Sequence, residues 1–402
     1  MLPSLHAVLW FLFCAANPAD VIHAERIDGQ AVAGSWVGLN GQEVVLQQED
    51  RQIRLPLSDL LNLSWTVKDA TTSTPATASA PADWPTRLFL KDGSEIPARI
   101  EAGDARTLTV QTRLIDHLNV PVNTLAAIRF LTSSPPGVDD AFANALAERR
   151  DTEDTLLVAA GDNIRTLIGV VESLTSEGGS FRWRQQRIPI QTDRTVGIVF
   201  ASTAESGPAA ATACRTRDGS IWAGQLVRGD REAVLLKLAA GQDIRIPVRG
   251  LSGIRINSDR VKFLDELQPT GYEFEPLGAT RRPWRRNRSV ANNPLRIAGN
   301  SFERGIGMHS KATLSYELTG DFSRFAAVVG IDDGARPRGS VVFRVTADGK
   351  EVFNSGPVIG QDQPRPILVD IHQARKLKLI VDYGEDLDVG DHANWCDARL
   401  IR

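Results

Sequence analysis

Hydrophobic positions recur in the same register four times along the first two thirds of the chain. Four segments align on a proline that lies between two apolar residues: IRLPLSDLLNLSW, LNVPVNTLAAIRF, QRIPIQTDRTVGI and IRIPVRGLSGIRI, containing Pro56, Pro121, Pro189 and Pro247. An apolar residue stands seven and nine positions after each proline, a spacing that places both side chains on one face of a strand. Four positions after the proline three segments have leucine, whereas the third has Asp193.

A turn signal precedes each proline at a nearly constant distance. Asp28-Gly29, Asp92-Gly93 and Asp218-Gly219 begin 28, 29 and 29 residues before their prolines, and Gly161-Asp162 takes this place in the third segment. Asp-Gly between alternating apolar residues indicates a hairpin, because glycine accepts a positive φ. Strand-like stretches such as TLTVQTRL fill the interval. The pattern therefore predicts four copies of a unit of about 45 residues, each with about five short strands.

Composition marks the joints between these units. Residues 69–83 are rich in Ala, Thr, Ser and Pro, which is typical of a solvated linker. Residues 139–150 predict the one clear helix, capped by Asp139 or Asp140 and acting as a spacer, with Phe142 and Leu146 on one face. The expected order is signal peptide 1–24, repeat 1 (25–66), linker 67–85, repeat 2 (86–131), linker with helix 132–152, repeat 3 (153–200), linker 201–211, repeat 4 (212–257) and a C-terminal domain 258–402.

The N-terminus and the bulk charge limit where the protein acts. Residues Ala7 to Ala16 are almost wholly apolar, which suits a secretory signal and is too short to span a bilayer. We therefore expect an exported protein, periplasmic, cell-surface or secreted, without a transmembrane segment. A formal charge of −3 creates no global field for nucleic acid. Cys214 and Cys396 lie in different predicted domains, which favours two separate buried thiols over a disulfide.

The C-terminal third reads as strands separated by Gly and Asp turns, about eight of them, which predicts a β-sandwich or jelly roll. Five marks stand there in order: LDELQP, RGIGMHS, VGIDD, GSVVFRVTADGK and DVGDHANWCDARL, the first at 264–269 and the last at 388–400. Residues from about 261 to 402 thereby resemble the family called the novel putative carbohydrate-binding module, which accompanies some glycoside hydrolases, including family 98. The resemblance implies a jelly roll similar to galactose-binding domains. Cys396 and Asn394 depart from the family, which usually has a small residue and Asp there.

The expected fold is therefore all-β: four tandem small β-barrel repeats followed by a jelly-roll β-sandwich. The layout of the repeats also resembles Sm-like small barrels through its strand spacing. Sm-like units often bind RNA, but these four share no aromatic or basic signature for bases and phosphates. We therefore expect no nucleic-acid partner.

The stretch DHANW, residues 391–395, concentrates candidate chemistry. One interpretation is structural, with Trp395 in the sandwich core and Asp391 bonded to turn amides. The other gives Asp391 and His392 a role in ligand or metal binding. A catalytic role lacks a second element that would complete a triad or ligand set.

Loops at one end of a jelly roll converge, and two further marks of the family resemblance carry polar residues on loops. These are His309 in GMHS and the pair Asp332-Asp333 in GIDDG. If the loops meet, His309, Asp332, Asp333, Asp391 and His392 are the predicted carbohydrate contacts, and calcium held by Asp332, Asp333 and Asp391 is the predicted metal. The alternatives are a solvated turn for the aspartates and a satisfied turn histidine for His309.

The run RRPWRRNR at 281–288 carries the densest positive charge. In an exported protein Arg285, Arg286 and Arg288 are candidate contacts for a sulfated or acidic polysaccharide. The alternative is a solvated strand edge with arginine stacked on Trp284. Two functions remain open. One is a non-catalytic exported protein that binds glycan through its C-terminal module. The other is a structural or protein-interaction protein of the cell surface whose β repeats mediate assembly, with other surface proteins as candidate partners.

Overall fold

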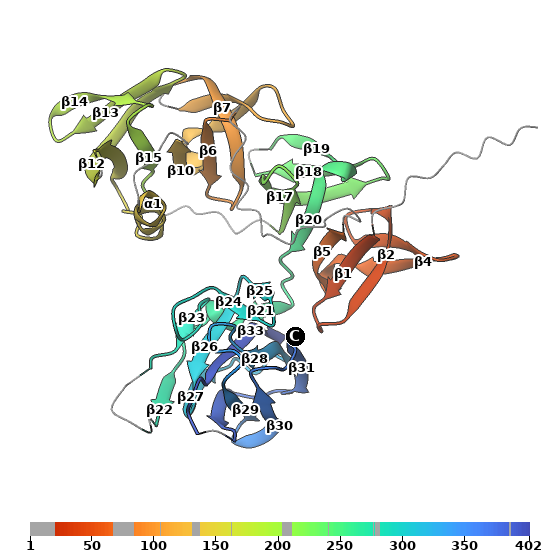
Figure 1. Cartoon of the computed structure of the whole chain (residues 1–402). Coiled ribbons are helices and arrows are strands. Elements are labelled where there is room, and N and C mark those ends of the chain that lie inside the picture. Colours follow the sequence, from red (N-terminus) through yellow and green to blue (C-terminus); the bar gives the residue numbers. More distant parts are fainter. Residues whose placement is uncertain are drawn as a thin grey trace, which may run out of the picture. The chain divides into compact units, whose positions relative to one another are not determined.

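The computed structural model describes residues 21–66, 84–104, 106–130, 137–161, 163–202, 211–239, 241–275, 277, 282–385 and 387–402. These residues form 33 strands, one α-helix and four short 3-10 helices, so the predicted all-β class is confirmed (Figure 1). No helix among them is long and apolar enough to cross a membrane. They divide into two compact units, of which the second contains residues 24–32, 56–62 and 256–402.

Each repeat contains five strands, as the proline-anchored pattern predicts. Repeat 1 has β1 (Val21–Arg26), β2 (Ala31–Leu39), β3 (Glu43–Gln48), β4 (Arg51–Pro56), η1 (Leu57–Asp59) and β5 (Leu60–Thr66). Repeat 2 has β6 (Thr86–Leu90), β7 (Glu95–Gly103), β8 (Thr107–Gln111), β9 (Leu118–Pro121), η2 (Val122–Thr124) and β10 (Leu125–Phe130). Repeat 3 has β11 (Asp154–Ala160), β12 (Asn163–Thr175), β13 (Gly178–Trp183), β14 (Gln186–Gln191) and β15 (Thr195–Val199). Repeat 4 has β16 (Thr212–Thr216), β17 (Ile221–Gly229), β18 (Ala233–Leu238), β19 (Asp243–Pro247), η3 (Val248–Gly250) and β20 (Leu251–Ile256).

The closing turn differs in the one repeat whose sequence departs from the pattern. In every repeat the fifth strand pairs with the first, for example β15 with β11 and β20 with β16. In repeats 1, 2 and 4 the proline ends the fourth strand, and a 3-10 turn leads to a fully buried leucine: Leu60, Leu125 and Leu251. In repeat 3, Asp193 is exposed at this position and Pro189 lies inside β14. A polar residue cannot fill the leucine's buried place, so the chain crosses by a plain turn.

The four separate small barrels that the sequence suggested are not confirmed, because strands of different repeats also pair with one another. Strand β10 of repeat 2 pairs antiparallel with β15 of repeat 3, with Ala127 opposite Val199, Ile128 opposite Ile198 and Arg129 opposite Gly197. Strands β9 and β19, which carry Pro121 and Pro247, belong to one extended sheet. An exposed strand edge presents unpaired backbone groups and is readily covered by another strand, which a local sequence pattern does not reveal. The Sm-like resemblance of the individual repeats stays a prediction.

The helix is a packing element rather than a spacer. Helix α1 spans Val138–Ala147, and its N-cap is Gly137 in a left-handed conformation, with φ of 77°. Neither Asp139 nor Asp140 caps it, which corrects the prediction; Asp139 instead pairs with Arg129 at 3.3 Å. Phe142 is buried in a cluster built from repeats 2 and 3, and its ring lies 5.4 Å from that of Phe89 between centroids. The helix therefore covers the junction between the two repeats.

The first repeat begins earlier than predicted. Residues 1–20, which hold most of the predicted signal peptide, lie outside the described residues. Strand β1 starts at Val21, and both Ile22 and Ala24 are fully buried. A boundary after Ala24 would cut this strand and remove two core side chains, so the repeat begins at Val21 rather than at residue 25.

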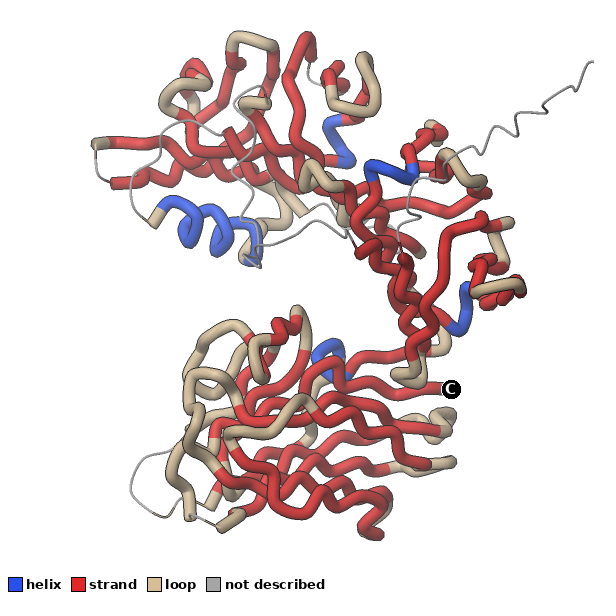
Figure 2. Tube along the Cα trace, turned by 45° about the vertical axis from the view of Figure 1, so that its right-hand side comes forward, coloured by secondary structure: helices blue, strands red, loops and turns tan. Residues whose placement is uncertain are grey.

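The C-terminal module is a sandwich of two sheets, which confirms the predicted β-sandwich. The strands are β21 (Val261–Phe263), β22 (Gly271–Phe274), β23 (Arg285–Arg286), β24 (Leu295–Ile297), β25 (Asn300–Phe302), β26 (Gly305–His309), β27 (Ala312–Glu317), β28 (Arg324–Ile331), β29 (Ser340–Ala347), β30 (Lys350–Ile359), β31 (Arg365–Asp370), β32 (Lys376–Tyr383) and β33 (His392–Ile401), with η4 at Leu264–Glu266. One sheet has the order β23-β26-β33-β28-β31, with β21 on β33, and the other has the order β22-β27-β32-β29-β30. Strands make up most of the module (Figure 2).

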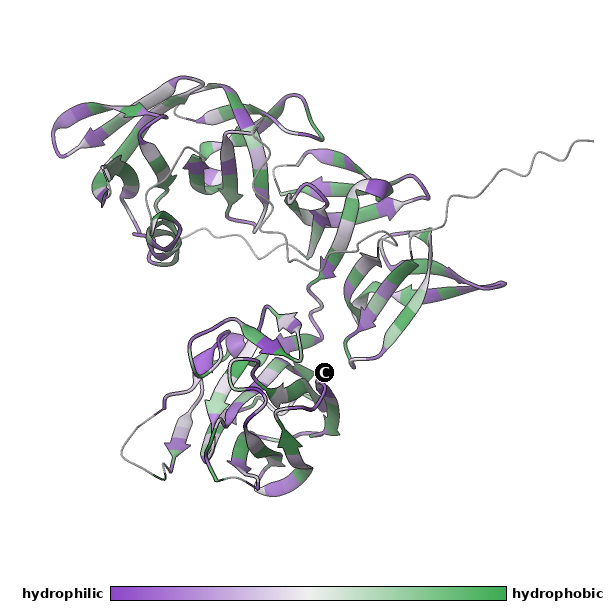
Figure 3. Ribbon diagram, viewed as in Figure 1, coloured by the Kyte–Doolittle hydropathy of each residue, from purple (hydrophilic) through white to green (hydrophobic). Residues whose placement is uncertain are grey.

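The core of the module lies between these two sheets. Its strands alternate hydrophobic and hydrophilic residues along their length (Figure 3), as a face-to-face sandwich requires. Trp395, Phe343 and Phe325 are among the fully buried side chains of the core cluster. Cys214 and Cys396 are both buried free thiols, which confirms that they are separate. Burial raises the pKa of Cys214 to about 12 and that of Cys396 well above its ordinary value.

Part of repeat 1 packs against the module within the second compact unit. Ile27 and Leu61 form an apolar cluster with Ala326 and Ile401. The buried side chain of Arg399 donates from Nε to the Ile27 carbonyl at 2.9 Å. An isolated fragment starting at residue 258 would expose this cluster and remove the Ile27 carbonyl that Arg399 binds, so the full chain is the proper object for binding experiments.

Candidate functional site

The site centres on two histidines that face each other across neighbouring strands. His309 ends β26 and His392 begins β33, and they are register partners with ring centroids 5.8 Å apart. Ala393 and Trp395 point into the sandwich core, so His392 and Asn394 point to the opposite, outer face of the six-stranded sheet. Phe274 of β22 meets the His309 ring edge-on at 6.3 Å.

The two histidines differ in exposure and in their hydrogen bonds. His309 is 2% exposed, and its Nδ1–H donates to the Ser310 carbonyl at 2.7 Å. His392 is partly exposed, and its Nδ1 has no hydrogen-bond partner within the described residues. Burial lowers the pKa of His309, and burial followed by the charge of His309 lowers the pKa of His392. Both rings are therefore neutral near pH 7, and His392 is the one that solvent reaches.

Asn394 is a candidate that the sequence analysis did not single out. It is fully buried on the same face as His392, two positions further along β33. Its Nδ2 donates to Asp332 Oδ2 at 2.8 Å, while its Oδ1 has no hydrogen-bond partner among the described atoms. The two-residue period of a strand would have pointed to this position once His392 was chosen. Buried polar atoms without partners are rare and call for an explanation.

The predicted loops do meet, although their carboxylates are engaged within the fold. The Asp332 N–H donates to the His392 carbonyl at 2.8 Å. Asp332 is 1% exposed. Its Oδ2 accepts from Asn394, and its Oδ1 accepts the Gly334 N–H at 3.0 Å. Asp391 is fully buried; Oδ1 accepts the Ser340 N–H at 3.0 Å and Oδ2 accepts the Ser310 hydroxyl. These bonds match the structural interpretation of Asp391, and the fully buried Trp395 matches its expected place in the core.

Asp333 and the other two predicted calcium ligands make hydrogen bonds within the fold. Asp333 is partly exposed, accepts the Gly299 N–H at 2.9 Å and lies 3.6 Å from Arg296. Within the described residues no three His, Cys, Asp or Glu side chains group closely enough to hold a metal ion. Asp332, Asp333 and Asp391 each accept hydrogen bonds from backbone amides or neighbouring side chains, and calcium binding by these three residues stays a prediction.

The arginine run lies on a sheet edge. Strand β23 holds Arg285 and Arg286 at the end of the six-stranded sheet, and Arg286 lies over the Trp284 ring at 5.7 Å. Arg286 also donates to the Leu267 carbonyl at 3.1 Å. Arg285 and Arg288 are exposed. This is the arrangement expected for a solvated edge with a stacked arginine, and polyanion contact by Arg285, Arg286 and Arg288 stays a prediction.

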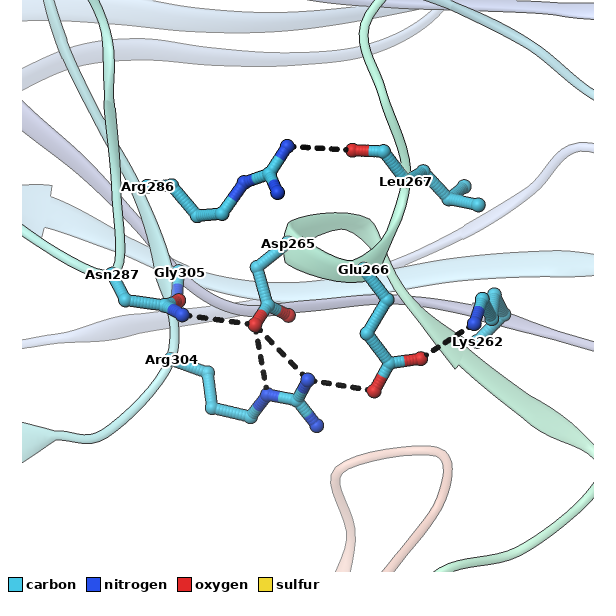
Figure 4. Close-up of polar contacts among 8 residues, drawn as sticks. All are labelled: Lys262, Asp265, Glu266, Leu267, Arg286, Asn287, Arg304 and Gly305. Atoms are coloured by element: carbon cyan, nitrogen blue, oxygen red, sulfur yellow. Dashed lines mark hydrogen bonds and ion pairs between the residues drawn. The ribbon is translucent and has the colours of Figure 1, made fainter. Parts of the chain in front are cut away.

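The family-like marks LDELQP and RGIGMHS form one polar cluster (Figure 4). Asp265 Oδ2 accepts hydrogen bonds from Arg304 Nε at 3.2 Å, Arg304 Nη2 at 3.0 Å and Asn287 Nδ2 at 3.0 Å. Glu266 accepts from Arg304 at 2.7 Å and pairs with Lys262 at 2.8 Å. Burial alone would lower the pKa of Arg304, but the bonds to Glu266 and Asp265 raise it. The contacts of Asp265, Glu266 and Arg304 therefore hold neighbouring segments of the module together.

Comparison with protein families decides what this module is. Residues 262–401 match the family model described as the NPCBM/NEW2 domain. The resemblance predicted from the sequence is confirmed for this third of the chain. Curated relatives include a Renibacterium salmoninarum protein named "Putative endo-alpha-N-acetylgalactosaminidase", 28% identical over 108 residues, and the alpha-1,3-galactosidase B of Akkermansia muciniphila, 31% identical over 117 residues. These matches cover 27% and 28% of this chain but only 7% and 15% of the relatives.

Solved structures give neighbours of the same kind. The CBM51 module from a Clostridium perfringens GH95 protein, solved with methyl-galactose, is 26% identical, with a TM-score of 0.32 over 35% of this chain and 99% of that one. The tandem CBM51 modules of a family 98 glycoside hydrolase from Streptococcus pneumoniae are 12% identical, with a TM-score of 0.32 over 94% of this chain and 88% of that one.

Proposed function

We propose that this is an exported, non-catalytic protein that binds glycan through its C-terminal NPCBM/NEW2 domain. The observation that carries the proposal is the match of residues 262–401 to that family. The short apolar N-terminal segment supports export. The buried aspartates of the module support a binding role over acid–base chemistry, because Asp265, Asp332 and Asp391 all accept hydrogen bonds from fixed neighbours.

The contact region we assign is the outer face around His392. His392 is the partly exposed residue of this face. Its Nδ1 and the neighbouring Asn394 Oδ1 are buried and have no hydrogen-bond partner within the described residues, so a ligand reaches them only if the side chains turn toward solvent. A sugar hydroxyl both donates and accepts, so it suits the neutral imidazole of His392 in that position. The aromatic pair of Tyr272 and Phe274, nearly parallel at 7° and 6.3 Å apart, lies beside His309 and adds an apolar wall.

The sugars to examine first are galactose-type. The names of the two curated relatives specify alpha-linked N-acetylgalactosamine and alpha-1,3-linked galactose. Their matching segments lie in a small part of much larger proteins, as is expected for a binding module attached to a catalytic domain. The neutral charge state of both histidines near pH 7 also suits an uncharged sugar better than an acidic one.

A glycan array probed with the full chain separates this function from the alternative. Glycan binding predicts retention of a related set of sugars, and His392→Ala should abolish that retention. His372 is the matched control, because it is an exposed histidine at the other end of the sandwich. The neighbouring Ile371 N–H donates to the Ser323 carbonyl, and the Ser323 N–H donates to the Ile401 carbonyl. Ile401 is the last residue of β33, whereas His392 is the first, so His372 lies near the opposite end of that strand.

The second candidate function rests on the pairing of β10 with β15. It shows that repeats associate edge to edge through their terminal strands. A protein of the cell surface could use further repeat edges in the same manner to bind other surface proteins. An array that retains no sugar, together with self-association of the chain, would favour this second function and count against the first.

A further inference from the structure

A pocket with a largely apolar wall and several charged residues lies where repeats 2 and 3 meet. Its volume is about 520 Å³, within the usual range for small-molecule sites. Apolar residues of both repeats, among them Val122, Val171 and Phe200, form much of its wall. Four polar residues also line it: Lys91, Arg106 and Asn123 from repeat 2, and Asp154 from repeat 3.

The walls of this pocket are fixed by backbone hydrogen bonds. The β10–β15 ladder joins the two repeats beneath it. Asp154 holds the repeat 3 side, since Oδ2 accepts the Val171 N–H at 2.8 Å and Oδ1 accepts the Ala201 N–H at 2.9 Å. The backbone N–H of Lys91 donates to the Thr124 carbonyl at 2.8 Å. The pocket is therefore preformed, which spares a ligand the cost of ordering it.

The charges around the pocket are mostly positive. Lys91 and Arg106 line it, and Arg149, just after helix α1, lies close enough to Lys91 to act on its charge. Burial, then repulsion by Arg149, lowers the pKa of Lys91. Nη1 of Arg149 is buried and has no hydrogen-bond partner among the described residues. The one lining carboxylate, Asp154, accepts hydrogen bonds from two backbone amides and also attracts Lys91, an effect that raises the pKa of Lys91 against burial and Arg149. Burial raises the pKa of Asp154 itself.

We propose that this pocket binds a small organic anion: a carboxylate, sulfate or phosphate group held by Lys91 and Arg106, with the rest of the molecule against the apolar wall. A bound oxyanion would reduce the repulsion that Lys91 experiences from Arg149, and it would accept charged hydrogen bonds from Lys91 and Arg106. The inference rests on the repeats alone and is independent of sugar binding by the module.

The test measures binding of defined probes to the full chain by calorimetry or ligand-detected NMR. Sulfate, phosphate and benzoate are the anions, and benzamide is the neutral match for benzoate. The variant pair Lys91→Met/Arg106→Met removes both cations. Arg165→Met is the matched control, since Arg165 is an exposed arginine on β12 that does not line the pocket. Circular dichroism establishes that each variant is folded. If the double variant does not fold, the single variant Arg106→Met takes its place in the test.

The proposal expects saturable binding of at least one of the three anions and none of benzamide. The double variant should bind roughly tenfold or more weakly, the effect of losing about one charged hydrogen bond, while Arg165→Met binds as the original chain does. Absence of saturable binding for all three anions overturns the proposal. Equal affinity in the double variant, or equal binding of benzoate and benzamide, also overturns it.

Discussion

His309 and His392 occupy directly opposed positions on β26 and β33, with their rings 5.8 Å apart. The charge of Arg282 lowers the pKa of both rings. The charge of Asp388 raises the pKa of His309. For His392, the charge of Asp332 raises the pKa and that of Arg338 lowers it. Protonating both histidines would place two positive charges side by side in a partly buried setting that already contains two arginines. The pair is therefore stable in its neutral form.

Acidification should destabilise the module through this pair. Each histidine has a pKa below its ordinary value of 6.5, so the unfolded chain binds more protons than the folded one as the pH falls below about 6.5. The stabilising effect of neutrality is complete above that pH and is lost as the pH falls toward 5. We expect His309→Gln/His392→Gln to flatten the fall in melting temperature between about pH 7 and pH 5.

Asp397 has the opposite effect on stability over the same pH range, so the experiment needs a comparison that cancels its contribution. Burial raises its pKa to about 6, so its contribution improves as the pH falls. The informative quantity is therefore the difference between the original chain and the double variant at each pH. His372→Gln should leave the profile unchanged. A double variant with the same pH profile as the original chain would show that other groups govern the acid response.

Trp395 and Asp391 should differ in what they contribute. Trp395 is fully buried and meets Phe343 edge-on at 5.0 Å, so Trp395→Ala should cost ~3–5 kcal/mol of unfolding free energy. Asp391→Asn keeps an oxygen for the Ser340 amide but loses the charge, so we expect a smaller cost of ~1–3 kcal/mol. Chemical denaturation measures both. If Trp395→Ala leaves stability unchanged and abolishes sugar binding, the tryptophan is a stacking surface and the roles are reversed.

The junction of repeats 2 and 3 should depend on one glycine and one arginine. A Cβ at Gly197 would lie 2.6 Å from the Phe142 ring and 2.7 Å from the Ile128 carbonyl oxygen, so Gly197→Ala should destabilise by ~1–3 kcal/mol. Arg129, directly opposite, donates to the Phe130 and Val196 carbonyls at 2.8 and 2.7 Å. Arg129→Met should cost ~2–4 kcal/mol. Denaturation that leaves both variants as stable as the original would refute this junction.

The mature N-terminus should retain strand β1. Ile22 and Ala24 are fully buried, so a signal peptidase that cut after residue 24 would remove core contacts. We expect exported protein to begin at or before Val21, as read by N-terminal sequencing or intact mass. A mature chain starting at Glu25 would contradict the place we assign to β1, and an intact Met1 on cytosolic protein would contradict export.

Local sequence patterns predicted the strands, but they did not predict pairings between strands far apart in the sequence. The alternation around Pro121 and Pro247 predicted five strands per repeat, because strand period and turn residues are local properties. The same pattern does not indicate which strand covers an exposed sheet edge, so it did not predict the pairing of β10 with β15. The helix begins one residue before the predicted caps, so Gly137 is its N-cap and Asp139 lies in its first turn, where it pairs with Arg129.

The candidate site was predicted in part. The family-like marks brought His309, Asp332 and His392 to one region, and the structure places them together. It also shows that the aspartates serve the fold, which depends on the particular amides and hydroxyls they meet and cannot be read from residue type. Asn394 was within reach of sequence reasoning by strand period alone, whereas its unpartnered oxygen was not.

The central claim is that the C-terminal module binds sugar at the face marked by His392. Its most direct test is a binding titration of the full chain with an alpha-linked galactoside or N-acetylgalactosaminide, run in parallel on the original protein, His392→Ala and His372→Ala. We expect saturable binding by the original chain, the same affinity in His372→Ala, and a roughly tenfold or greater loss in His392→Ala. Equal affinity in all three proteins would contradict the site, and no binding of any galactose-type sugar by the folded original chain would contradict the proposed ligand class.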